Sequence, residues 1–151
     1  MIRRIAVVSV TALVLSVALH ADCLAQRGGR RGGGWGVGSA YNRMYDITTV
    51  ETVRGEVARV EQFVPYQGAL PGVHLVLTTG SESLSVHLGP AWFIENQDES
   101  IEVGDNVAVT GSRILFLGEP AIVAASVRLG EQVLQLRDRR GLPVWSGWQR
   151  W

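Results

Sequence analysis

The stretch PGVHLVLTTGSESLSVHLGPAW, residues 71–92, decides the fold. Apolar and polar residues alternate in two runs, 73–79 and 83–88, which flank a Gly-Ser step. A period of two is typical of a half-buried β-strand, and a loop of two residues joins two such strands into a hairpin. The stretch therefore predicts an antiparallel hairpin with one face turned toward a hydrophobic core.

The loop at 80–81 also fixes which residues of the hairpin face one another. It places Leu77 opposite Leu84 on the core side, and it places His74 directly opposite His87 on the other side. A slip of one residue would turn the leucines of one strand outward, so the buried face protects this register. We expect both imidazoles to lie side by side on the water-facing surface of the sheet.

Two opposed histidines are a candidate metal site. Their Cβ atoms lie about 4.5 to 5.5 Å apart, so that ring nitrogens of His74 and His87 can share one copper, zinc or nickel ion. Protein zinc sites use about three or four protein ligands, so a further donor is required. The candidate donors are Met44, Asp46, Glu95 and Asp98.

The alternative is that the two histidines are solvated, or that they stack on Trp92 or bond to nearby backbone. In either case two imidazoles that both become charged repel each other. This corner of the protein is therefore expected to be sensitive to pH below about 6.5.

Tryptophans supply the other candidate binding residues. Trp92 follows a Gly-Pro step and is a candidate ligand-binding residue at the rim, next to Phe93 and Ile94, which we expect in the core. The C-terminal VWSGWQRW holds three more, of which Trp151 is a candidate for stacking on a ligand. Trp145 and Trp148 are expected to form a strap against the barrel.

The rest of the chain predicts an all-β protein. A long first strand over 49–64 is expected to bend at Gly55. A short helical crossover is expected over 90–97, because Pro90 at its start suits the first turn of a helix. Further short strands are predicted at 106–110, 113–117, 121–128 and 131–138, with a break at Gly111. This order favours a small OB-like barrel of five to six strands with a short helical crossover after the third strand. A small β-sandwich is the alternative.

The N-terminal part divides into two segments. Residues 1–25 are typical of a signal peptide, with Arg3 and Arg4 before an apolar run and small residues at its end. A lipid anchor at Cys23 is the alternative, which Asp22 fits poorly. Residues 26–45 are rich in glycine and arginine and are expected to be a flexible segment. Residues 46–151 form the predicted barrel domain with its tryptophan-rich C-terminal strap.

Composition narrows the function classes. Without residues 1–25 the chain has twelve arginines, no lysine and thirteen carboxylates, so it is almost neutral and lacks the basic footprint of a nucleic-acid-binding protein. After signal cleavage no transmembrane segment is expected. The motifs GxSxG, HExxH and GxxxxGK[ST] do not occur, and no catalytic cysteine is left after cleavage, so we expect a non-enzymatic protein. The predicted signal peptide places it most simply in the periplasm.

Five blocks carry a resemblance to a known family. They are YNRMYDITTVETVRGEV (41–57), VHLGPAWFIENQ (86–97), VGDNVAVTGSR (103–113), PAIVAASV (120–127) and LRDRRGLPVWSGWQR (136–150). Together they resemble small exported bacterial proteins of OB-like fold and the domain shared by the magnetosome-associated MamS and MamX proteins. MamX-type proteins carry CxxCH haem-attachment motifs, which this chain lacks, so covalent haem is not expected.

Three hypotheses for function follow. The first is an exported binding module that holds a metal ion or small ligand near His74, His87 and Trp92. The second is an envelope interaction or scaffold protein of the MamS type, whose partner is another envelope protein. The third, oligonucleotide binding, rests on fold analogy alone and ranks lowest because of export and neutral charge.

Overall fold

The computed structural model of the protein describes residues 33–147. It holds six strands: β1 (Val50–Phe63), β2 (Gly72–Thr78), β3 (Ser83–Pro90), β4 (Asn106–Phe116), β5 (Glu119–Leu129) and β6 (Gln132–Gln135). The helical elements are short: α1 (Ala91–Ile94) and the 3-10 turns η1 (Asn42–Met44), η2 (Ile47–Thr49) and η3 (Val144–Gly147). The predicted signal peptide over 1–25 lies outside these residues.

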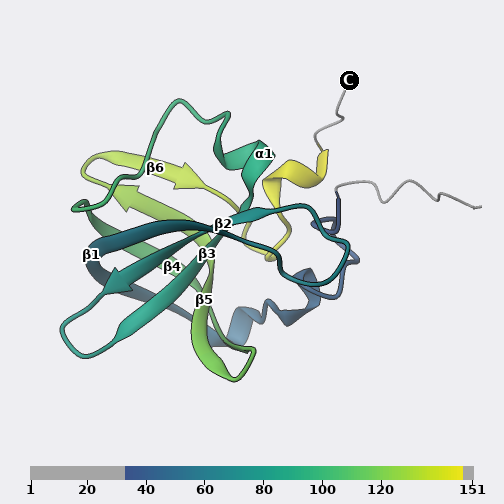
Figure 1. Cartoon of the computed structure of the whole chain (residues 1–151), viewed down its shortest axis with the longest axis horizontal. Coiled ribbons are helices and arrows are strands. Elements are labelled where there is room, and N and C mark those ends of the chain that lie inside the picture. The colour runs from purple at the N-terminus through teal and green to yellow at the C-terminus, as the bar shows by residue number, and fades with distance from the viewer. Residues whose placement is uncertain (1–32, 148–151) are drawn as a thin grey trace, which may run out of the picture.

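The strands form a barrel-like ring. Their order is β3-β2-β1-β4-β5-β6, and an additional parallel pairing of β3 with β5 closes the ring, with β6 added beside β5 (Figure 1). All other strand pairs are antiparallel. The predicted OB-like barrel, with one short helix after the third strand, is confirmed. No helix within residues 33–147 is long and apolar enough to cross a membrane.

β1 is curved and pairs with a different strand in each of its halves. Its first half, up to Glu56, pairs with β4, and its second half pairs with β2. The sequence predicted a bend at Gly55. The register of the pairing with β2 instead shifts between Val57 and Arg59, a few residues further along the strand. Gly55 allows a close approach instead, since a Cβ there would lie 2.3 Å from the carbonyl oxygen of Thr78.

The predicted break at Gly111 is wrong. Residues 106–110 and 113–117 were expected as separate strands, but β4 runs through this glycine with only a register shift after Thr110. A Cβ at position 111 would lie 2.3 Å from the carbonyl oxygen of Val123, so glycine is needed here for strand contact and not for a turn.

The N-terminal segment 33–45 is packed against the barrel. Trp35 is fully buried, and its Nε1 donates to the carbonyl oxygen of Leu70 at 2.8 Å. The carbonyl oxygen of Trp35 in turn accepts from Asn42 Nδ2 at 2.8 Å and from Trp145 Nε1 at 3.0 Å. The expectation of a flexible segment over 26–45 therefore needs correction for 33–45, because aromatic burial outweighs the glycine content; 26–32 lie outside the described residues.

Candidate functional site

The two histidines of the hairpin meet as predicted. In the β2–β3 ladder Leu77 pairs with Leu84 and His74 pairs with His87, just before a register shift at Val73. The ring centroids of His74 and His87 are 5.9 Å apart. Alternation and the two-residue loop were sufficient to place these two side chains on one face of the hairpin.

That face is covered and does not meet water at His87, which corrects the expectation of a solvated pair. Only 1% of His87 is exposed. The ring centroids of Phe63 and Phe116 lie 4.4 and 4.7 Å from that of His87, and the ring of Tyr41 stacks on it with a centroid distance of 5.9 Å. One of these covering side chains, Tyr41, comes from the N-terminal segment and lies 46 residues away along the chain.

His87 is held as a neutral ring. Tyr41 Oη lies 2.9 Å from His87 Nδ1 within hydrogen-bonding distance. Burial, and secondarily the charge of His74, lowers the pKa of His87 to about 3. Burial also raises the pKa of Tyr41, so its hydroxyl stays protonated and is available as a donor to the imidazole.

His74 is mostly buried, with 19% of its side chain exposed, and both of its ring nitrogens have partners. Nδ1 lies 3.0 Å from Ser85 Oγ, and Nε2 lies 3.0 Å from Glu61 Oε2, while the ring stacks on Phe63 at 5.2 Å. The hydrogen bond with His74 is the main cause that lowers the pKa of Glu61. The imidazole is thereby oriented between two strands and a carboxylate that sequence analysis had not placed beside it.

The four proposed third ligands do not gather at the histidines. Among residues 33–147 no group of three His, Cys, Asp or Glu side chains is arranged to hold a metal ion. Met44 packs on the core, Asp46 accepts from the backbone N–H of Thr48, Glu95 accepts from Gln62 and Asp98 is exposed. The pair alone therefore remains as the candidate metal-binding geometry.

Of the two candidate tryptophans, the structure describes only Trp92. Trp92 is partly buried in α1 and makes an edge-on contact with Phe93 at 6.1 Å. Phe93 is buried as expected and contacts the buried Trp145 at 5.4 Å. Trp148 and the candidate stacking residue Trp151 lie outside the described residues.

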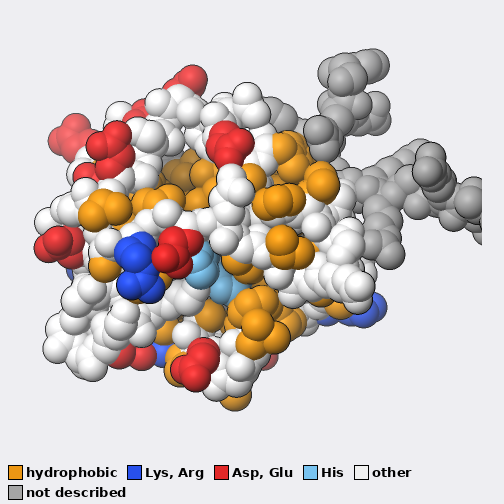
Figure 2. Space-filling model, in the orientation of Figure 1, with side chains coloured by type: hydrophobic (Ala, Val, Ile, Leu, Met, Phe, Trp, Pro, Cys, Tyr) orange, Lys and Arg blue, Asp and Glu red, His pale blue; other side chains and the backbone are white. Residues whose placement is uncertain are grey.

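A groove lies beneath the crossover that follows α1, and the sequence pattern did not predict it. We call it the crossover groove; it has a volume of about 290 Å³. Its lining is apolar except for one serine and several acidic and amide side chains, and Figure 2 shows the hollow with an orange floor between red side chains. The lining residues are Val60, Glu61, Gln62, Val73, Leu75, Leu88, Ile94, Glu95, Gln97, Glu99, Ser100, Ile101 and Leu134.

Two glutamines hold the acidic rim of the crossover groove. Gln62 on β1 donates to Glu95 Oε1 at 3.1 Å, and Gln132 on β6 donates to Glu99 Oε1 at 2.7 Å. The crossover is thus tied to a strand on each side of the groove. Both amide donors are neutral, and no arginine lines the groove, so these bonds leave the two negative charges in place.

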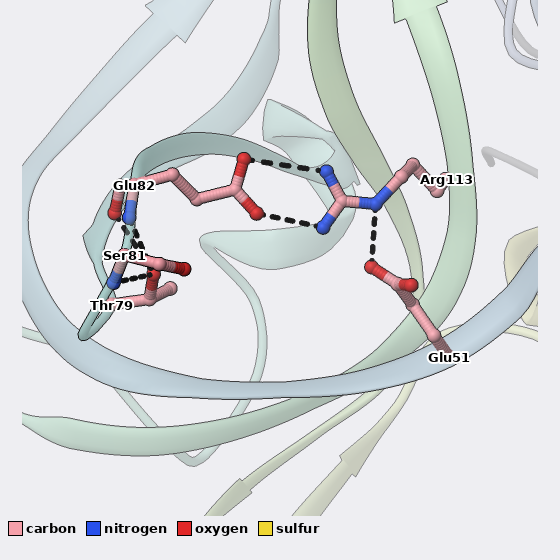
Figure 3. A network of polar contacts seen from close by, with 5 residues as sticks. All are labelled: Glu51, Thr79, Ser81, Glu82 and Arg113. Atoms are coloured by element: carbon pink, nitrogen blue, oxygen red, sulfur yellow. Dashed lines mark hydrogen bonds and ion pairs between the residues drawn. The ribbon is translucent and has the colours of Figure 1, made fainter.

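A second polar network braces the far end of the hairpin (Figure 3). Arg113 donates from Nε to Glu51 at 2.6 Å and from Nη2 to Glu82 at 2.8 Å, which links β4 to β1 and to the β2–β3 loop. Thr79 Oγ1 accepts from the backbone N–H groups of Ser81 and Glu82. The three charged side chains Glu51, Glu82 and Arg113 pair with one another, which indicates a structural role in fixing the hairpin loop.

Two aromatic residues of the N-terminal segment lie beside the loops that take part in oligonucleotide binding in OB-type barrels. These loops follow the first and the fourth strand. Trp35 contacts the first loop through Leu70, and Tyr41 lies 6.4 Å from Phe116 at the end of β4. Both residues also contact the ring of Phe63, whose centroid lies 5.8 Å from that of Trp35 and 6.3 Å from that of Tyr41.

Comparison with known proteins gives one result. The model of a family described as the MamS/MamX magnetosome protein family matches residues 49–134, which span β1 to β6 except for the last residue of β6. No curated protein and no solved structure matches the chain.

Proposed function

Since this chain belongs to the MamS/MamX magnetosome protein family, we propose that it is a non-enzymatic interaction module which binds a segment of an envelope protein in the crossover groove. The segment is basic at its flanks and apolar at its centre. The signal-like residues 1–25 support export, and we propose the periplasm as the place of action. The observation that carries the proposal is an apolar floor beneath two uncompensated carboxylates.

The floor of the crossover groove can hold a small number of apolar side chains. Leu75, Leu88, Ile94, Ile101 and Leu134 contribute to it. A volume of 290 Å³ is close to the lower end of ligand pockets, which begin at about 300 Å³. It therefore accommodates one or two apolar side chains of a peptide more readily than a large cofactor.

The rim supplies the selectivity. Glu95 and Glu99 carry negative charge at the edge of the groove, and their orientation is fixed by Gln62 and Gln132. Complementary charge at the rim of an interface guides a partner to its place and disfavours wrong ones. A partner with arginine or lysine beside the buried apolar residues therefore fits, and an acidic partner does not.

The test uses two capped peptides, Arg-Leu-Leu-Arg and Glu-Leu-Leu-Glu, in calorimetric titrations of the mature protein. We expect binding of the basic peptide only, and a loss of affinity of about tenfold in the double variant Glu95→Gln and Glu99→Gln, which is worth about 1.4 kcal/mol. Glu119→Gln, at the start of β5, is the matched control and should bind as the original protein does. Equal affinity for both peptides would refute the proposal.

A copper, zinc or nickel ion at His74 and His87 is the second candidate. The direct pairing of the two residues in the ladder favours it. Binding would require His74 to exchange its bond to Glu61 or Ser85 for the metal. Titration with each ion tests this, and His74→Ala is the suitable variant because the His74 side chain, unlike the buried His87, is partly exposed to water. Unchanged heats in His74→Ala would remove this candidate.

A further inference from the structure

Arg137 is the one side chain of permanent charge that is fully buried among residues 33–147, with 1% of its surface exposed. It follows β6 and pairs through a single bridge with Pro143, shortly before η3. Arginine is almost never fully buried unless it is paired with an anion. A buried arginine at this place therefore indicates either a pairing group or a ligand.

The guanidinium group is held firmly on several sides. Its central carbon lies 5.1 Å from the ring centroid of Tyr45 and 5.3 Å from that of Trp145. Nη1 donates to the carbonyl oxygen of Gly141 at 3.1 Å. Gly141 has a φ of +81°, and a Cβ there would lie 2.5 Å from the Tyr45 ring, so only glycine lets this turn close over the arginine.

One edge of the same group has no partner. Nε and Nη2 lack a hydrogen bond to any of the described residues, although both atoms are buried. The neighbouring carboxylate, Asp138, accepts instead from the backbone N–H groups of Arg140 and Leu142, each at 2.9 Å. Contacts with aromatic rings offset part of the cost of burying the charge, but they leave the two N–H donors unsatisfied.

The free edge has the shape that recognises a carboxylate. Nε and Nη2 carry two parallel N–H groups in one plane, which match the two oxygens of a carboxylate. Arg139 is exposed in the adjoining turn and adds positive charge that attracts an anion, whereas Arg140 is paired with Asp138 at 3.4 Å. Because both atoms are buried, a ligand reaches them only when the surrounding residues move aside, so it must be small.

We propose that Arg137 is the anchor of a binding site for a small carboxylate, of the size of formate or acetate, which accepts hydrogen bonds from Nε and Nη2. The site lies between the N-terminal segment and η3 and is separate from the crossover groove. It does not depend on the function proposed above. The bound anion would supply the counter-charge that Arg137 lacks among the described residues.

The test follows the Nε–Hε resonance of Arg137 by NMR in the mature protein. Sodium formate is titrated against sodium chloride at constant ionic strength, and we expect a saturable shift of this resonance and a rise in Tm with formate. Arg137→Lys keeps the charge but loses the fork, so its Tm should not respond, while Arg140→Gln should respond as the original protein does.

Two results would overturn the proposal. One is an Arg137 resonance that does not move with formate; the other is a gain in Tm in Arg137→Lys equal to that of the original protein. The resonance titration needs no variant, so it decides the question even if Arg137→Lys does not fold.

Discussion

The Oη atom of Tyr41 lies 2.9 Å from Nδ1 of His87, which joins the N-terminal segment to the third strand of the barrel. The rings of Phe63 and Phe116 shield this hydrogen bond from water. Residues that precede the family-matched region therefore complete the packing of its hairpin. The pair of histidines is consequently coupled to the stability of the fold, whatever else it binds.

The buried His87 should make stability depend on pH. Its folded pKa of about 3 lies below its ordinary value of 6.5, so the unfolded chain binds a proton that the folded chain rejects between these values. The free energy of unfolding should therefore fall as the pH drops below 6.5, by up to about 1.4 kcal/mol per pH unit. The groups that face His87 are Tyr41 and His74.

Urea denaturation between pH 7.5 and 5 measures this slope, above the range in which carboxylates such as Glu61 and Asp138 take up protons. His87→Phe should be flatter over this range, whereas His74→Gln should keep the slope. A slope that is the same in His87→Phe and in the original protein would contradict the assignment.

Removing the Tyr41 hydroxyl should destabilise the protein. Tyr41→Phe leaves a buried imidazole nitrogen without its partner, at a cost of about 1 to 3 kcal/mol. Tyr66→Phe is the control, because Tyr66 Oη donates to the carbonyl oxygen of Gly34 at a partly buried position and should cost less. Chemical denaturation at pH 7.5 compares the two. Equal losses would show that the His87 contact has no special weight.

Trp35 should be as important as any core residue of the barrel. Trp35→Ala removes a fully buried indole and its bond to Leu70, and should cost about 3 to 5 kcal/mol. Val37, which is 47% exposed, provides the comparison, and Val37→Ala should change stability very little. Thermal unfolding measures both. A mild effect of Trp35→Ala would mean that the segment 33–45 is dispensable for the fold.

Glycines of β4 and of the hairpin loop should respond differently to alanine. A Cβ at Gly111 would collide with the backbone of Val123, so Gly111→Ala should cost about 1 to 3 kcal/mol or more through displacement of β5. Gly80 has no atom within 4 Å of the added position, so Gly80→Ala should be nearly neutral. Tm values of the two variants test the comparison, and equal shifts would argue against the close strand contact.

Local patterns were sufficient for the strands and for the register of the hairpin. Alternation showed which residues of each strand share a face, and the loop at 80–81 fixed the register between the two strands. The pairing of His74 with His87 followed from that register. The prediction of a strand break at Gly111 was wrong for a physical reason. A glycine can serve a turn or a close strand contact, and only the position of β5 distinguishes these.

The surroundings of the site could not be predicted in the same way, because they depend on residues far apart in the sequence. Tyr41 and His87 are 46 positions apart, and both glutamines of the groove lie 33 positions from their carboxylates. The glycine-rich composition around Trp35 favoured a flexible segment, although the aromatic residues within it were a signal of packing. Arg137 stood within a run of charged residues that is ordinarily solvated.

The most direct test of the account is an NMR map of the mature protein with the basic Arg-Leu-Leu-Arg peptide. We predict that backbone shifts concentrate around the crossover groove, from Ile94 to Ile101 and at Leu134, and that they vanish in the double variant of Glu95 and Glu99. Shifts spread evenly over the surface, or centred on the Arg113 network at the far end of the hairpin, would contradict the claim that the groove is the interaction site.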